Sequence, residues 1–498
     1  MNVNPITRLD YPDPDMIRVE DTYYMVSTTM HFMPGCEILQ SFDLVHWEHA
    51  TYVYETLDHT DAQQLKSGQN IYGQGMWAAS LRYHEGRFYI CFVANDTRKT
   101  YLYTSEKIDG PWKKQLIEGF YHDGSLLFDE DGRNYIVYGN DEIWITELNE
   151  DLTAPKKDGL HRLLVSDHKN PELGYEGSHI QKINGYYYIF LIHSLRDRWM
   201  RTEACFYSDS LEGEFTGGDV LCDDRGYCGQ GVAQGGIVDT PDGKWYAMLF
   251  QDSGAVGRIP ILLPVTWKDH FPVFGQNGHV PEEIEVHSTR PGYIYQPLVG
   301  SDDFCNGLLP RWQFNHDPDP RYYHLDALQG TYTITTREVC TELTQAVNTL
   351  TQRMSYPSCA AEVTVDASAL KEGDVAGLCA LQGCYAAVGI TKHHGKYEVL
   401  MLDKKEDGIL DMTEGTVVES HQMDFRLEAD FCNMKDEARC YYRVNKGDWL
   451  PIGTVHKLYF KLDHFTGCRF GLFCYAAEET GGSACFRDFK YYDVDEIS

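Results

Sequence analysis

Apolar and polar residues alternate with a period of two along most of the chain, in short runs that end at turn residues. Such alternation is typical of β-strands buried on one face, whereas an amphipathic helix repeats its apolar positions every three or four residues. Few segments show the helical period. The pattern therefore predicts an all-β protein.

One hairpin pattern occurs five times in the first half of the chain. Each copy starts at a polar or aromatic residue, runs through a short strand to a tight turn that usually ends in Gly, and continues in an aromatic-rich second strand. Such turns between alternating runs are the strongest local signal for a β-hairpin. The copies are residues 13–24, 77–88, 123–135, 176–187 and 234–245.

A weaker signature follows three of the hairpins. Residues 41–47, 105–112 and 208–215 each begin with Ser and end with an aromatic residue, and we interpret them as outer strands with a shared turn. A hairpin with outer strands, recurring at roughly 45–65 residues, has the size of a four-stranded propeller blade. The repeat therefore predicts a five-bladed β-propeller over residues 1–298.

The alternation continues beyond residue 301, but the hairpin repeat does not. Period-two runs lie at residues 331–336, 360–365, 425–429 and 469–475. They predict a second domain over residues 301–498, an antiparallel β-sandwich of the jelly-roll type, joined to the propeller by residues near 285–302. An independent lectin function for this domain is an alternative interpretation.

The propeller prediction brings the first residues of the five repeats together. The innermost strand of each blade lines the central channel, so equivalent positions on successive blades form a ring. Three carboxyl groups in one ring are unfavourable unless they are hydrogen-bonded or their pKa values diverge. The alternative is that they are turn and strand-end acids without chemistry. The ring residues are Asp13, Trp77, Asp123, Glu176 and Gln234.

Composition narrows the class of partner. Aromatic residues make up 13% of the chain, and flat rings suit both pleated sheets and the C–H face of a sugar. The formal net charge is −32, which disfavours nucleic acids and anionic membranes but is indifferent to neutral sugars. We expect a small oligosaccharide as the binding partner and expect neither nucleic acid nor a membrane. Composition does not decide between a single chain and an assembly of identical chains.

Sequence features also bear on the compartment. The first residues lack the basic and apolar regions of a signal peptide, and no apolar run approaches the ~20 residues that span a bilayer. The 15 cysteines form no CxxC pair, and as free thiols they fit a reducing environment. We therefore expect a cytoplasmic protein.

Several short motifs stand along the first 300 residues. They are Tyr11-Pro-Asp-Pro-Asp15, residues 32–41, 76–78 and 122–132, Tyr175-Glu-Gly-Ser-His179 and Gly257-Arg-Ile-Pro260. In this order and at this spacing they resemble the motifs of glycoside hydrolase family 43, the family of β-xylosidases, α-L-arabinofuranosidases and arabinanases. The segments from residue 312 to 319 and from 348 to 353 resemble the concanavalin-like domain that follows the propeller in many family β-xylosidases.

The resemblance implies hydrolysis by a single displacement, which needs one ionised and one protonated carboxyl group. Asp13 resembles the general base and Glu176 the general acid. Asp123 resembles the third carboxylate, which orients the acid and raises its pKa. Asp15 lies two residues beyond Asp13, and we interpret it as a supporting residue at the start of a strand.

The resemblance also implies residues that bind the sugar. Trp77 is expected to stack on the terminal sugar, with a place in the core as the alternative. Arg258 is expected to bind a hydroxyl or to orient the base, with a surface ion pair as the alternative. Phe32 is a candidate wall of the site, and core packing is the equal alternative.

Two positions depart from the family pattern. Many relatives have His where Gln234 stands, and that His helps to hold a calcium ion in the channel. Gln offers no imidazole, so we expect Gln234 to line the sugar site and expect no metal or other cofactor. Many relatives also have Phe where Met30 stands, which leaves the choice of sugar open.

These observations predict an inverting, exo-acting hydrolase that releases terminal xylose or arabinose from oligosaccharides. Asp13 and Glu176 lead the first and fourth blades, so we expect them to face each other across the channel at the roughly 6.5–9.5 Å of an inverting pair. The alternatives are an arabinan- or fructan-cleaving propeller and a propeller that binds sugars without catalysis.

Overall fold

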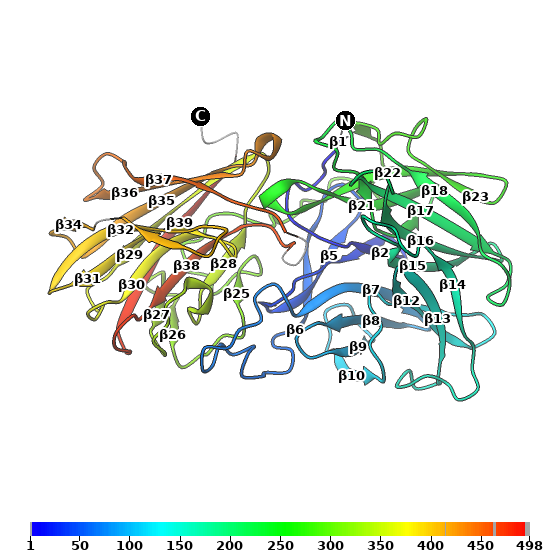
Figure 1. Ribbon diagram of the computed structural model, residues 1–498, viewed down its shortest axis with the longest axis horizontal. Coiled ribbons are helices and arrows are strands. Elements are labelled where there is room, and N and C mark those ends of the chain that lie inside the picture. Colours follow the sequence, from blue (N-terminus) through cyan, green and yellow to red (C-terminus); the bar gives the residue numbers. More distant parts are fainter. Residues whose placement is uncertain (1, 414, 462–464, 494–498) are drawn as a thin grey trace.

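The computed structural model describes residues 2–413, 415–461 and 465–493, which form two β-rich lobes (Figure 1). Within these ranges there is no α-helix. The only helical elements described there are three 3-10 turns, at Gly254–Val256, Leu343–Gln345 and Cys432–Met434. The structure confirms the all-β prediction.

The first lobe is a five-bladed propeller, as predicted, and every predicted hairpin forms the inner pair of a blade. The first four blades have four strands each. In the fifth blade, the innermost position is shared by two short strands, β19 and β20, which both pair with β21.

The blades, in chain order and from the inner strand outward, have the following bounds. The first two are β2 (Asp15–Val19), β3 (Thr22–Val26), β5 (Gly35–Ser41) and β6 (Glu48–Tyr54), then β7 (Met76–His84), β8 (Arg87–Ala94), β9 (Lys99–Ser105) and β10 (Lys113–Ile117). The third is β11 (Ser125–Phe128), β12 (Asn134–Asn140), β13 (Glu142–Leu148) and β14 (His161–Ser166). The last two are β15 (Glu176–Ile183), β16 (Tyr186–Ser194), β17 (Arg201–Ser208) and β18 (Thr216–Leu221), then β19 (Val232–Ala233), β20 (Ile237–Asp239), β21 (Trp245–Asp252), β22 (Arg258–Lys268) and β23 (Phe271–Phe274).

Each of the three predicted segments that begin with Ser forms the turn between the third and fourth strands of its blade. The outer strands that we predicted there lie before and after this turn. Ser41, Ser105 and Ser208 each end a third strand. Each hydroxyl accepts a hydrogen bond from the backbone N–H two residues later, at 3.1, 3.2 and 3.3 Å. This Ser-initiated turn explains why the same pattern recurs in three blades.

The second lobe is an antiparallel sandwich of two sheets, as predicted. The first sheet has the order β33 (Leu410–Met412), β32 (Lys396–Lys404), β31 (Ala386–His393), β30 (Val375–Leu381), β38 (Arg469–Tyr475), β28 (Leu350–Arg353), β25 (Gln313–Asn315) and β4 (Phe32–Met33), with β34 (Thr416–Val418) beside β32. The second has the order β26 (Tyr323–Asp326), β27 (Thr331–Thr335), β39 (Ser483–Asp493), β29 (Ser358–Asp366), β35 (Gln422–Asp430), β36 (Glu437–Val444) and β37 (Leu450–Lys457). Inward-facing residues of both sheets form the largest apolar cluster.

The two lobes are joined by backbone pairing as well as side chains. Strand β4 belongs to the propeller segment but pairs with β25 of the sandwich. A buried ion pair links Arg353 Nη1 of the sandwich to Glu37 Oε2 of the first blade at 2.8 Å. The buried carboxylate of Asp10 accepts a hydrogen bond from the N–H of Gly467 at 2.9 Å. Strand β1 (Asn2–Val3) pairs with β24 (Glu283–Ile284) in a separate two-stranded sheet outside the blades.

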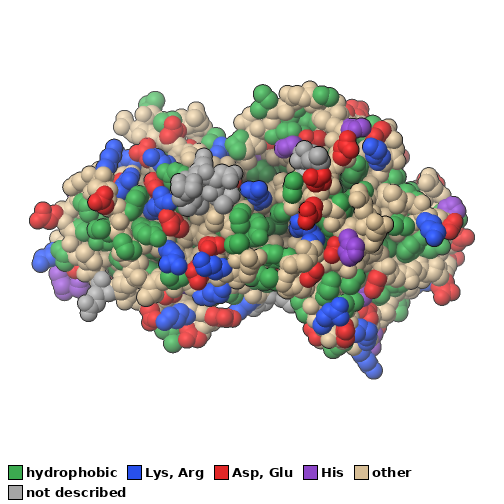
Figure 2. All heavy atoms as spheres, turned by 90° about the horizontal axis from the view of Figure 1, so that it is seen from above, with side chains coloured by type: hydrophobic (Ala, Val, Ile, Leu, Met, Phe, Trp, Pro, Cys, Tyr) green, Lys and Arg blue, Asp and Glu red, His purple; other side chains and the backbone are tan. Residues whose placement is uncertain are grey.

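The surface mixes charge types. Figure 2 shows acidic and basic side chains scattered over one face of both lobes, without a large area of a single sign. In the part of the chain that the structure describes, no helix has the length and apolar character needed to span a membrane.

Candidate active site

A cavity of about 200 Å³ lies at one end of the propeller channel. The five residues that lead the predicted hairpins, one from each blade, all line it. The structure therefore brings together the ring that the repeat predicted. The full lining is Asp13, Trp77, His122, Asp123, Asn140, Leu173, Glu176, Arg201, Gln234, Arg258 and Phe465.

Irregular backbone at the start of each inner strand turns these side chains into the cavity. Asp13 and Asp123 have left-handed φ angles of 52° and 48°, two residues before β2 and β11 begin. The pairing register shifts after Trp77 in β7 and after Glu176 in β15, and such bulges re-aim side chains. Gln234, with a φ of 59°, separates β19 from β20.

The buried carboxylate of Asp13 is held by two donors. Arg258 Nη1 lies 2.7 Å from Oδ1, and Thr28 Oγ1 lies 2.6 Å from Oδ2. Arg258 Nε also contacts Asp252 Oδ1 at 3.2 Å, and Arg201 Nε binds the other oxygen of Asp252 at 2.6 Å. This chain of charged groups fixes Asp13 in one orientation toward the cavity.

Glu176 and Asp123 are held by different donors. Asn140 Nδ2 donates to Glu176 Oε2 at 2.7 Å, and the N–H of Gly177 donates to Asp123 Oδ2 at 3.0 Å. Gly177 has a φ of 65°, and a Cβ there would lie 2.7 Å from Gln234 Cδ. A larger residue would therefore disturb the backbone donor that holds Asp123.

The two carboxyl groups have opposite pKa shifts. Burial raises the pKa of Asp123 to about 6, and the nearby charges of Glu176 and Asp13 add to this effect. Burial also acts to raise the pKa of Glu176, but His122, together with the charges of Arg201 and Arg258, outweighs burial and holds this pKa below its ordinary value. The raised pKa therefore lies on Asp123, whereas the family resemblance implied a raised pKa on Glu176. The family resemblance had not assigned a role to His122, which contributes most to this difference.

His122 lies between the two carboxyl groups. Its Nε2 is 3.6 Å from Asp123 Oδ2 and 3.7 Å from Glu176 Oε2. Burial lowers the pKa of His122, but the charges of Asp123 and Glu176 outweigh burial and raise it to about 9. The His122 ring also meets Trp77 edge-on, with 6.5 Å between the ring centroids.

Aromatic groups from both domains flank the cavity. The rings of Trp77 and Phe465 meet at 66° with 5.2 Å between their centroids. Phe465 belongs to the sandwich domain, and its ring centroid lies 3.8 Å from Cζ of Arg258. The second domain therefore contributes a wall beside the predicted sugar platform.

Phe32 does not line this cavity. Its ring is 1% exposed and lies in the interface between the domains, 3.5 Å from Cζ of Arg469. The reason is β4, which carries Phe32 into the sandwich sheet. Of the two interpretations of Phe32, the structure supports core packing, and Phe465 occupies the wall.

Five lining residues were missed by sequence reasoning. Arg201 begins the third strand of the fourth blade, the place that Arg258 has in the fifth, so comparing blades could have found it. Asn140 ends a second strand, and His122 precedes Asp123 within a quoted motif. Leu173 and Phe465 stand outside the repeat, and no sequence signal marks them.

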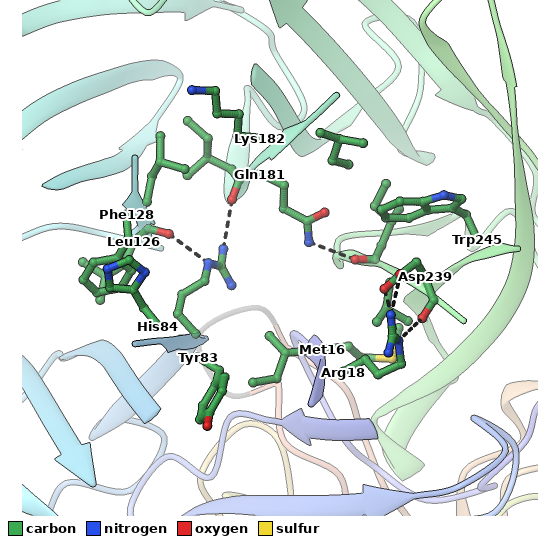
Figure 3. Close-up of a pocket in the computed structure, with 17 residues that line it drawn as sticks. Met16, Arg18, Tyr83, His84, Leu126, Phe128, Gln181, Lys182, Asp239 and Trp245 are labelled. Atoms are coloured by element: carbon green, nitrogen blue, oxygen red, sulfur yellow. Dashed lines mark hydrogen bonds and ion pairs between the residues drawn. The ribbon is translucent and has the colours of Figure 1, made fainter. Parts of the chain in front are cut away.

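The channel below the cavity is closed by Arg82. Asp15, which we interpreted as a supporting residue, accepts one of its hydrogen bonds, and His179 Nδ1 lies 3.0 Å from the other Asp15 oxygen. Arg82 and Asp15 thus separate the cavity from a wider opening of about 420 Å³ at the far end, which Figure 3 shows with Trp245 at its edge. The acceptors around Arg82 are Asp15 Oδ2 (2.7 Å), Leu81 O (2.6 Å), Ser125 Oγ (2.6 Å), Leu126 O (2.8 Å) and Ile180 O (3.2 Å).

One group of described residues has the spacing of a metal site. His122, Asp123 and Glu176 each bring one donor atom within 4.8 Å of the others. Gln234, which departs from the family pattern, is buried, and its N–H donates to Glu203 Oε2 at 2.7 Å.

Known proteins resemble this chain along most of its length. A beta-xylosidase of Formosa agariphila is 26% identical over 555 residues, covering 99% of this chain and 89% of the relative. A non-reducing end alpha-L-arabinofuranosidase of Bacteroides ovatus is 26% identical over 352 residues, covering 66% of this chain and 63% of the relative.

A solved structure, a bifunctional GH43-CE protein of Bacteroides eggerthii, superposes with a TM-score of 0.91 at 42% identity. The match covers 99% of this chain but only 63% of that longer protein. The family model for the beta xylosidase C-terminal concanavalin A-like domain matches residues 301–492. The model for glycosyl hydrolases family 43 matches residues 3–272, more than half of the chain. The chain therefore belongs to glycosyl hydrolases family 43 and is a glycoside hydrolase.

Proposed function

We propose that the protein is an inverting, exo-acting hydrolase that releases terminal xylose or arabinose from small oligosaccharides in the cytoplasm. The observation that carries this proposal is the cavity of about 200 Å³, in which three carboxyl groups surround space for about one sugar ring. Arg82 closes the channel below it, and Phe465 stands beside its sugar platform. The Phe465 ring walls one side of the cavity beside Trp77 and Arg258, which favours the end of a sugar chain over a chain that lies across the cavity.

The contacts support distinct roles for the carboxyl groups. Asp13, fixed by Arg258 and Thr28, removes a proton from the attacking water. Glu176 gives a proton to the departing oxygen, and Asn140 holds its Oε2. Asp123 and Glu176 compete for the same proton, because one carboxylate oxygen of each lies within 4.8 Å of the other.

One panel of substrates tests the proposal against its alternatives. We expect hydrolysis of nitrophenyl β-xyloside, nitrophenyl α-arabinofuranoside or both, with a much lower kcat/KM on linear arabinan and on fructan. A preference for arabinan or fructan would favour the corresponding propeller hydrolases. Sugar binding without turnover of any of these compounds would favour the non-catalytic alternative.

The stereochemistry of the first product is a separate prediction. If Asp13 activates water on the face opposite the leaving group, a β-xyloside releases α-xylose first. Proton NMR in the first minutes, before mutarotation, distinguishes the two anomers. Initial β-xylose would indicate a covalent intermediate and would contradict the assignment of Asp13 as base.

We also propose that activity needs no divalent ion. Calcium does not fit the residues in the channel, because the Arg82 guanidinium, itself a cation, takes up the acceptors there, and Gln234 offers no imidazole. Dialysis against EDTA is expected to leave kcat within about twofold, well below the effect of losing a metal ligand shell. A loss that calcium restores would contradict this proposal and would place a metal in the cavity, either near Gln234 through waters or at the group formed by His122, Asp123 and Glu176.

A further inference from the structure

His122 has a position that neither the base nor the acid assignment explains. Its Nε2 is buried and makes no hydrogen bond within the described part of the chain. Both carboxylate oxygens that face it lie just beyond hydrogen-bond distance, at 3.6 and 3.7 Å. A buried polar nitrogen without a partner is costly, so its retention here needs an explanation.

The charges around the cavity are not balanced without protons. Arg201 and Arg258 supply two positive charges, whereas Asp13, Asp123 and Glu176 supply three negative ones. Asp252 adds a fourth negative charge, since it contacts both arginines. Of the residues that line the cavity, His122 is the one further side chain that gains a positive charge near neutral pH.

On the basis of the proposed function, we propose that His122 is a positioning residue that stores the proton delivered by Glu176. Before a sugar binds, the imidazole holds the proton and Glu176 is ionised. A bound sugar covers the cavity and excludes water, which penalises two separated charges more than two neutral groups. The proton then moves from His122 to Glu176.

The proton steps balance over one turnover. The N–H bond at Nε2 of His122 breaks and an O–H bond forms on Glu176, so that both groups become neutral. Glu176 then passes this proton to the glycosidic oxygen as the C–O bond breaks, while Asp13 takes a proton from the attacking water. After product release, Asp13 loses its proton to solvent and His122 takes one up.

The geometry of Glu176 is consistent with this transfer. Asn140 donates to Oε2, the oxygen that also faces His122, and no hydrogen bond is formed by Oε1 in the described residues. The proton from Nε2 therefore arrives on Oε2, which as a hydroxyl oxygen can still accept the hydrogen bond from Asn140 while it donates the proton to the glycosidic oxygen. Asp123, which faces the same imidazole, stabilises the positive charge while His122 stores the proton.

The test is the pH dependence of kcat/KM for His122→Asn. At about pH 5, where Asp123 and Glu176 keep one proton between them, we expect the variant to have near wild-type kcat/KM. At about pH 8 we expect its kcat/KM to fall at least about tenfold below that of the wild type. The loss at alkaline pH should shrink on a nitrophenyl pentoside whose leaving group needs no proton. Added imidazole should restore alkaline activity to His122→Ala.

His287→Asn is the matched control. His287 also lies near two carboxylates, 3.8 Å from Asp242 and from Glu285, but on the exposed surface. This variant should keep the wild-type pH profile. An equal loss at every pH in His122→Asn would show a purely structural role, and an unchanged alkaline limb would also overturn the proposal. Wild-type turnover of pentosides tests the proposed function separately from either result.

Discussion

Replacing Glu176 with Gln is expected to leave the fold intact and to lower kcat at least about 10²-fold on a pentoside with a poor leaving group. Gln has the shape of Glu and can still accept the hydrogen bond from Asn140, but it has no proton to give to the departing oxygen. The loss should shrink on a nitrophenyl pentoside of low leaving-group pKa. Steady-state kinetics on a series of aryl pentosides measures this dependence.

Glu147→Gln provides the matched control for this prediction. Glu147 is also buried and ion-paired, with Lys156 Nζ at 2.6 Å, but it lies on β13 away from the cavity. Its replacement should lower the free energy of unfolding but should leave the dependence of kcat on the leaving group unchanged. Equal losses for Glu176→Gln on good and poor leaving groups would move the acid role to another residue.

Most of the propeller could be predicted because its information is local. Each hairpin combines period-two alternation with a turn, and the inner strands β2, β7, β11 and β15 start within two residues of the predicted leading residue. The fifth blade is less regular, since Gln234 interrupts its inner strand. The repeat still predicted Gln234 in the ring. The reason is that its position depends on the place of the hairpin in the blade and not on an unbroken inner strand.

The remainder of the site depends on contacts between distant segments. Phe465 approaches Trp77 from the second domain, and Phe32 leaves the site because β4 joins the sandwich sheet. Neither event follows from periodicity or from a repeat. The effect of His122 on Glu176 likewise depends on a spacing of 3.7 Å between two blades. A sequence motif can identify such residues, but it does not give the distances between them that determine their pKa values.

Asp13→Asn is expected to lower kcat by about 10³-fold or more, within the range of general-base catalysis, and equally for good and poor leaving groups. The amide can still accept from Arg258, and the Thr28 hydroxyl can reverse its role and accept from the new NH₂ group. Arg258 also keeps Asp252 as a charged partner. The variant should therefore fold, and thermal unfolding monitored by circular dichroism checks this.

The control is Asp15→Asn, two residues along the chain. Asp15 is also buried and paired with an arginine, Arg82 at 2.7 Å, but it belongs to the channel closure below the cavity. Both variants remove one buried carboxylate charge, so both should lose stability, by about 1.5–3 kcal/mol for a hydrogen bond to a charged group. Only Asp13→Asn also removes the group that accepts the water proton. An equal reduction of kcat in Asp15→Asn and Asp13→Asn would indicate that both substitutions act by changing the shape of the channel. Asp13 would then not be the base.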